Sequence, residues 1–181
     1  LQWSLVGSEM CIRDRLAFEG KDVLDLGCGA GGATIYLAQH YSPRTIIGYD
    51  IEEPVLEYAR TRASVNHSLS HITFRLGKPG KLPFNAADFD IVFSKEVIVH
   101  IPDKEAFFED VYRILKPGGK FAASDWLTSH DGTPSEDMQA YFAINGLAFS
   151  MRSASHYVAA MEAAGFVDIK TVDRNHWACS F

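Results

Sequence analysis

The chain has 181 residues, of which 47% are hydrophobic and 22% charged, and its formal net charge is -6. This length and composition fit one globular domain with a single core. The negative charge and the absence of Lys and Arg clusters weigh against a protein that wraps nucleic acid, because cations must neutralise phosphates. We expect a small-molecule or protein partner; the sequence does not indicate an oligomeric state.

The cysteines indicate the compartment. They stand at positions 11, 28 and 179, with neither metal-binding spacing nor a paired framework, which is typical of a reducing environment. No stretch of the sequence reaches the roughly 20 apolar residues of a membrane span. We therefore expect a cytoplasmic protein without a metal site, a disulfide or a membrane anchor.

The N-terminal segment does not read like the rest of the chain. Residues 5–15 resemble the in-frame translation of a transposon-type sequencing-library adapter. We expect residues 1–15 to be non-native and leave them out of the fold; the alternative is a natural amphipathic N-terminus. Residues 16–181 are then expected to form a single domain, truncated at both ends.

From residue 22 onward, short apolar runs alternate with longer amphipathic ones, which predicts βαβ units on a parallel sheet. Phe108, Val111 and Tyr112 recur at helical spacing before the breaker at 116–119, and a second helix is expected over 153–164. Residues 127–152 read as an irregular excursion of the kind that often covers a site. The expected strands are 23–26, 45–49, 72–75, 89–93, 120–124 and 166–172.

A glycine loop follows the first expected strand. Gly27, Gly29 and Gly32 satisfy G-x-G-x-x-G between a strand and a helix, a pattern that also occurs in dinucleotide-binding proteins. Asp25 distinguishes a dinucleotide from a cationic cofactor such as S-adenosylmethionine. A carboxylate at the mouth of the loop repels a pyrophosphate but attracts a cation. Asp50 ends the second strand, where it can accept hydrogen bonds from ribose hydroxyls in either class.

A simpler interpretation of the same residues is open. Gly29 and Gly31 could serve only a tight strand-to-helix turn, with Asp50 a solvated residue at the end of a strand. The joint occurrence of acid, glycines and second acid in a βαβ context favours the cofactor.

The glycine loop and two further features carry a family resemblance. The loop at 25–32, the pairing of 82–84 with 89–90, and the turn at 115–119 together resemble the class I S-adenosylmethionine-dependent methyltransferases. The resemblance covers residues 22 to about 174 and implies an α/β, Rossmann-like, doubly wound and mostly parallel sheet, here without the usual last antiparallel strand. It implies S-adenosylmethionine as cofactor, with Lys78 where the family places an acid near the adenine. The cofactor-binding residues that it implies are Asp25, Gly27, Gly29, Gly31, Asp50, Ile51, Lys78, Ser94 and Lys95.

The segment after the fourth expected strand carries the candidate catalytic residues. Glu96 and His100 are four residues apart, and on a helical turn this spacing places an acid and an imidazole on one face. A histidine can accept a proton near neutral pH, and methyl transfer needs an acceptor with a free lone pair. The alternative is a core or capping histidine before Pro102.

Within the family, the pattern is most similar to the small-amine N-methyltransferases acting on phosphoethanolamine or, more loosely, on glycine, sarcosine or dimethylglycine. This similarity implies that His100 is catalytic and that Glu96 lies near the acceptor amine. It also implies that Trp126 and Tyr141 contact the substrate, where aromatic faces attract ammonium groups; ordinary packing is the alternative for both.

Two departures bear on the substrate and on activity. The residues that grip phosphate in the phosphoethanolamine group are replaced by Asn145 or Leu147 and by Phe149, with Arg152 a possible substitute. The tyrosine that partners the histidine belongs to an N-terminal lid, which the suspected adapter replaces, and this favours an inactive fragment. An O- or C-methyltransferase, a cofactor-binding module without turnover and, least favoured, an NAD oxidoreductase remain as alternatives.

Overall fold

The computed structural model describes residues 3–4, 16–65, 71–144, 146 and 149–173. The suspected adapter at 5–15, the cysteines at 11 and 179, residues 145 and 147, and the chain after 173 lie outside them. In the described part of the chain, no helix is long and apolar enough to cross a membrane. The elements are β1 Trp3–Ser4, β2 Asp22–Leu26, α2 Gly32–His40, β3 Thr45–Asp50, α3 Glu53–Ser64, β4 Ile72–Leu76, β5 Phe89–Lys95, the 3-10 helix η2 Ile98–His100, α4 Lys104–Ile114, β6 Leu115–Ser124, α5 Glu136–Ile144, α6 Ala154–Ala164 and β7 Ile169–Lys170.

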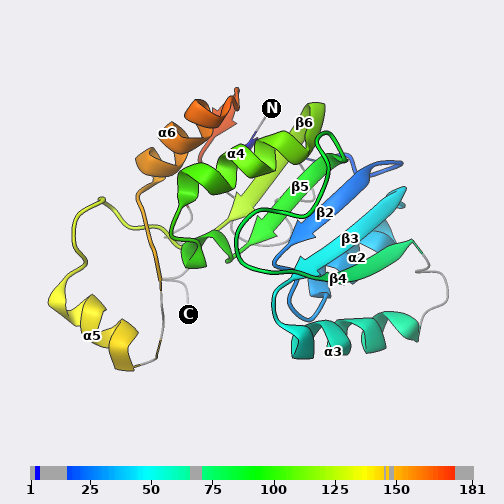
Figure 1. Cartoon of the computed structure of the whole chain (residues 1–181), viewed down its shortest axis with the longest axis horizontal. Helices are drawn as coiled ribbons and strands as arrows, with labels where there is room; N and C mark the ends of the chain where they lie inside the picture. Colours follow the sequence, from blue (N-terminus) through cyan, green and yellow to red (C-terminus); the bar gives the residue numbers. More distant parts are fainter. Residues whose placement is uncertain (1–2, 5–15, 66–70, 145, 147–148, 174–181) are drawn as a thin grey trace.

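A parallel sheet forms the centre of the domain (Figure 1). Its five strands lie in the order β4-β3-β2-β5-β6, and each neighbouring pair is parallel. The strand order reverses between β2 and β5, where an open α/β sheet presents its ligand crevice beyond the carboxyl ends of the strands. The predicted doubly wound α/β fold is confirmed.

The two faces of the sheet bury different sets of side chains. Leu24 and Leu26 of β2 belong to the core that α4 and α6 cover, and these two helices lie side by side over that face (Figure 1). Val23 belongs to the opposite core, which α2 covers. This alternation follows from the two-residue period of a strand, and it places Asp25 on the α2 side with Val23.

Both helices on the first face have recognisable caps. The Asp103 carboxylate accepts a hydrogen bond from the amide of Ala106 at 2.9 Å, and the Ser153 hydroxyl accepts one from His156 at 3.1 Å. α6 ends at Gly165, whose φ of 102° lies in the left-handed region that glycine tolerates. The helix expected over 153–164 is therefore confirmed.

Two expectations need correction. Within 166–172 only Ile169–Lys170 is a strand, and it pairs with β1 and not with the five-stranded sheet. The reason is local: Phe166 is buried in the core, and Asp168 has a φ of 55°, which interrupts an extended chain. The excursion at 127–152 is not wholly irregular, since it contains α5, which has no buried residues and lies away from the sheet (Figure 1).

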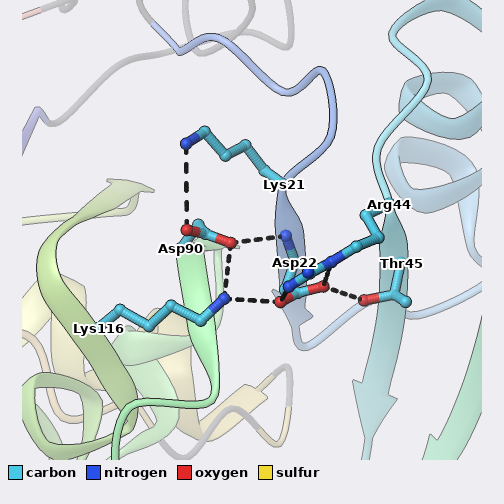
Figure 2. Close-up of polar contacts among 6 residues, drawn as sticks. All are labelled: Lys21, Asp22, Arg44, Thr45, Asp90 and Lys116. Carbon is cyan, nitrogen blue, oxygen red and sulfur yellow. Dashed lines mark hydrogen bonds and ion pairs between the residues drawn. The ribbon is translucent and has the colours of Figure 1, made fainter.

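A charged network joins four strands at the end of the sheet opposite the glycine loop (Figure 2). Asp22 accepts hydrogen bonds from Arg44, Thr45 and Lys116. The Lys116 ammonium also reaches Asp90 at 2.8 Å, and Asp90 accepts a bond from the backbone amide of Asp22 at 2.9 Å. These cations hold the pKa of Asp22 far below its usual range, despite the opposing effect of burial. The network fixes the register of β2, β3, β5 and β6 at their amino ends.

Candidate functional site

The glycine loop between β2 and α2 is built from left-handed residues. The φ values of Gly27, Gly29 and Gly31 are 77°, 51° and 73°, so each stands where an L side chain is strained. The loop is joined to β3 by hydrogen bonds from the amides of Gly27 and Cys28 to the carbonyl of Tyr49, at 2.7 and 3.2 Å. A Cβ added at Gly29 would meet nothing within 4 Å. The loop therefore bends tightly and presents an open surface at Gly29.

Asp25 lies beneath this loop and not at its mouth, where the sequence suggested it. Its side chain is only 2% exposed, and it accepts a hydrogen bond from the Thr34 hydroxyl of α2 at 2.5 Å. Strand alternation explains the difference, because residue 25 points to the face that α2 covers. Asp25 therefore lies under α2, where almost none of its surface is open to a ligand.

The environment of Cys28 shows that Asp25 and Asp50 create a negative electrostatic potential inside the loop. Its pKa is raised far above the usual value, first by burial and then by the negative charges of Asp25 and Asp50. Charges that disfavour a thiolate also disfavour a pyrophosphate at the same place, and they favour a cation. The preference of the loop for a cation, which the sequence analysis attributed to Asp25 alone, thus rests on both Asp25 and Asp50.

Asp50 ends β3 directly beside the loop. One carboxylate oxygen accepts a hydrogen bond from the amide of Gly29 at 2.7 Å, and the other accepts one from Glu52 at 3.0 Å. A carboxylate offers about four acceptor positions, so further donors can bind to it. The structure brings Asp50 and the glycine loop together, as a ribose-binding arrangement requires.

Two other predicted cofactor residues follow β3 and β4 at the same edge of the sheet. Ile51 comes directly after Asp50, with 49% of its surface exposed. Lys78 follows β4, and its backbone amide donates to the Tyr49 hydroxyl at 3.2 Å. The Lys78 side chain is exposed. The backbone near residue 78 is therefore held against β3 by a tyrosine that the sequence analysis did not single out.

Ser94 and Lys95, the last residues of β5, differ in their surroundings. Ser94 is fully buried, and its hydroxyl donates to the Leu26 carbonyl at 2.9 Å. Lys95 is exposed. Ser94 thus joins the carboxyl ends of the two strands that flank the crevice.

The glycine loop also touches the segment that carries His100. A Cβ built on Gly27 would lie 2.0 Å from Cγ2 of Val97, closer than two carbon atoms that share no bond can approach. Only glycine lets Val97 pack directly on the loop. The cofactor side and the acceptor side of the candidate site are therefore in contact.

The helical argument for Glu96 and His100 is wrong. Glu96 has a φ of 57°, and its amide bonds to the Ser124 carbonyl at 2.7 Å. The helical turn η2 begins only at Ile98 and ends at His100, so the four-residue spacing does not place the two side chains on one helical face. Both side chains are exposed, and the His100 ring lies 5.1 Å from that of Phe149.

The two predicted aromatic substrate residues lie on different parts of the chain. Trp126 follows β6 by two residues and is 58% exposed. Tyr141 lies on α5 and is 57% exposed. Two ring contacts connect α5 with His100: the Phe142 ring meets the Phe149 ring edge-on at 5.3 Å, and the Phe149 ring is tilted against His100. The structure thus brings α5, but not specifically Tyr141, to the histidine.

Sequence reasoning missed a polar group beside η2, formed by the buried Lys104 and Tyr157 and the partly buried Asp125. The Tyr157 hydroxyl donates to Asp125 at 3.0 Å, and burial is the main cause that raises the pKa of Asp125 to about 6. Lys104 is fully buried and donates to the carbonyls of Ile98 and Ile101. An acid immediately after a strand at the crevice edge was a signal that could have revealed Asp125.

Comparison with known proteins agrees with this geometry. Residues 17–164 match a family model described as a methyltransferase domain. The chain belongs to this methyltransferase family. The matched residues include the glycine loop, Asp50, the His100 turn and Trp126.

Relatives of the methyltransferase domain include enzymes with different acceptors. The chain is 36% identical over 155 residues to phosphoethanolamine N-methyltransferase 1 of Triticum aestivum, covering 86% of this chain and 30% of that protein. It is 35% identical over 113 residues to a fatty-acid O-methyltransferase of Mycolicibacterium smegmatis, covering 62% of this chain and 40% of that protein.

Among solved structures, phosphoethanolamine N-methyltransferase 2 of Haemonchus contortus, in complex with S-adenosyl-L-methionine, superposes with a TM-score of 0.76 and 26% identity. The match covers 87% of this chain and 36% of that one. The chain thus spans about a third of the length of the phosphoethanolamine enzymes that it matches.

Proposed function

We propose that this domain transfers the methyl group of S-adenosylmethionine to the nitrogen of a small amine. The observation that carries the proposal is the packing of Val97 on Gly27. This packing places the turn that ends at His100 against the loop that would hold the cofactor. The sequence similarity to a phosphoethanolamine N-methyltransferase supports the same reaction class.

The residues at the loop fit S-adenosylmethionine. The open surface at Gly29 leaves room for a ligand against the backbone, and Asp50 has acceptor positions for the two ribose hydroxyls. The negative field of Asp25 and Asp50 suits a cationic cofactor. When bound, the cofactor supplies a methyl carbon that its sulfonium activates.

His100 would act on the acceptor. An exposed imidazole on the turn that follows Val97 can take a proton from an ammonium group and so free the nitrogen lone pair that attacks the methyl carbon. The exposed ring of Trp126 offers a face for the same ammonium group. Because Phe149 packs on His100 and cannot donate a hydrogen bond, we propose a small amine as the acceptor without committing this surface to a phosphate group.

A second candidate function is methyl transfer to oxygen. The similarity to a fatty-acid O-methyltransferase favours it, and the geometry at the loop serves it equally well. The acceptor would then present a hydroxyl or carboxylate, and Trp126 would lose its role as a cation-binding face. We place either enzyme in the cytoplasm, as the cysteine usage suggests.

A screen with methyl-labelled S-adenosylmethionine tests the proposal. Ethanolamine, phosphoethanolamine, glycine, sarcosine and dimethylglycine are offered with a fatty acid, and the products are identified. Labelled amine is the expected result, and labelled ester would favour the second candidate. In the same assay His100→Ala should lower turnover far more than cofactor affinity; equal losses would indicate a structural histidine. Binding of S-adenosylhomocysteine with no labelled product would indicate a module without turnover.

A further inference from the structure

The buried group of Lys104, Asp125 and Tyr157 lies directly under the turn that carries His100. Lys104 begins α4, yet it is 0% exposed, and its ammonium donates to the carbonyls of Ile98 and Ile101. These carbonyls belong to η2 and to the residue that follows it; the Ile98 carbonyl also accepts the amide of Ile101 at 2.9 Å, so the ammonium is its second donor. Lys104 therefore fastens the turn from its carboxyl end.

Asp125 faces the same turn from the side of β6. Its carboxylate accepts hydrogen bonds from the backbone amide of Trp126 at 2.9 Å and from the Tyr157 hydroxyl at 3.0 Å, and the backbone amide of Val99 lowers its pKa. The Lys104 ammonium lies 5.6 Å from the centre of the Tyr157 ring. Tyr157 therefore contacts both Lys104 and Asp125. One partly buried carboxylate thus connects the backbone of Trp126 with helix α6 and faces the His100 turn.

Burying a lysine fully and an aspartate partly is costly, and apolar side chains of similar volume would often stabilise a core at least as well. The Lys104 ammonium here donates to backbone carbonyls of one turn, and the Asp125 carboxylate accepts from the backbone of Trp126 and from Tyr157 of α6. Such an arrangement gains conformational specificity where a single backbone position matters. The position in this case is that of His100.

We infer that Lys104, Asp125 and Tyr157 are positioning residues, which hold the 97–101 turn and the backbone of Trp126 in the arrangement that presents His100 and Trp126 to the acceptor. The inference rests on the proposed function for its consequence in catalysis, but the fastening of the turn is measurable without turnover. It also makes the turn dependent on pH, because only the ionised carboxylate offers all of its oxygens as acceptors.

The groups around Asp125 determine that pH. Tyr157 faces it from α6 and Lys104 from α4, while Arg152 and Glu105 act on Lys104 with opposite signs. The pKa of Asp125 is raised to about 6, mainly by burial. Above this pH the carboxylate is ionised and attracts the amides of Val99 and Trp126; below it, this attraction weakens.

Amide NMR spectra of the chain test this part directly. The signals of Val99 and Trp126 should titrate with a midpoint near pH 6, in the wild type and in His100→Ala alike. They should show no such step in Asp125→Asn. A step that survives in Asp125→Asn, or one that disappears in His100→Ala, would overturn the inference, because the titrating group would then not be Asp125.

The role of Lys104 is tested with a matched pair of lysine variants. Lys104→Met keeps the buried stem and removes both donations to the turn, whereas Lys116→Met removes ion pairs at the opposite end of the sheet. Hydrogen exchange at the amides of His100 and Ile101 should quicken about tenfold in Lys104→Met alone. Equal exchange in the two variants would overturn the positioning role.

Turnover then links this role to catalysis. With whichever acceptor the wild type methylates, Lys104→Met should lower kcat about tenfold while cofactor affinity stays within about twofold. Lys116→Met should leave kcat unchanged. Exchange that quickens without a loss of kcat would overturn the catalytic consequence. If the wild type methylates no acceptor, the proposed function fails, and the titration and exchange results still decide whether the group holds the turn.

Discussion

Replacing Gly27 by alanine should cost far more stability than the same change two residues later. Gly27 has a φ of 77°, and an added Cβ would lie 2.0 Å from Cγ2 of Val97. A left-handed alanine costs about 1 to 2 kcal/mol, and forcing a methyl group into a packed contact costs a further 1 to 3, so Gly27→Ala should lower the free energy of unfolding by about 2 to 5 kcal/mol.

Gly29→Ala is the matched control for this prediction. Its φ is 51°, but an added Cβ would meet nothing within 4 Å, so only the conformational cost of about 1 to 2 kcal/mol applies. Urea unfolding of both variants measures the difference. Adding Val97→Ala to Gly27→Ala should relieve the clash and recover part of the loss. Equal losses at the two glycines, or no recovery in the double variant, would refute the packing of the loop on the His100 segment.

Two further predictions concern opposite ends of the sheet. Asp22→Asn should lower the free energy of unfolding by roughly 1.5 to 3 kcal/mol at neutral pH, the range for hydrogen bonds between charged groups. Because the folded pKa of Asp22 lies below the unfolded value of about 3.9, the wild-type advantage persists above that pH and shrinks as the pH falls; an advantage undiminished in acid would contradict the network. Trp126→Ala should raise the KM for an amine about 2- to 30-fold, the loss of one cation-π contact, with Trp126→Phe less affected; an unchanged KM would remove Trp126 from the acceptor site.

Much of the fold could be predicted because its causes are local. The strands at 23–26 and 45–49 are short apolar runs, and the helix at 153–164 has a serine cap and a terminal glycine. The region after Gly165 could not be predicted in the same way. There Phe166 turns into the core and Asp168 adopts a left-handed conformation, which depends on tertiary packing and not on local propensity.

The site shows the same division. The loop glycines and Asp50 could be predicted from spacing, because a strand, a tight turn and a helix place them in a fixed order. The burial of Asp25 depends on α2 lying over its face of the sheet, and the backbone at Glu96 depends on a bond to β6. Lys104 lies on a helix that precedes Asp125 in the sequence, and Tyr157 lies on one that follows it. Only the folded chain therefore brings the three together.

Calorimetric titration with S-adenosylhomocysteine tests the central claim most directly, because it asks whether the loop and Asp50 hold the cofactor without requiring an acceptor. The wild-type chain should bind S-adenosylhomocysteine and not NAD. Asp50→Ala should weaken that binding by about 1 to 3 kcal/mol, since it leaves the polar partners of the carboxylate unpaired. Binding of NAD in preference to S-adenosylhomocysteine, or equal affinity of the wild type and Asp50→Ala, would contradict the account.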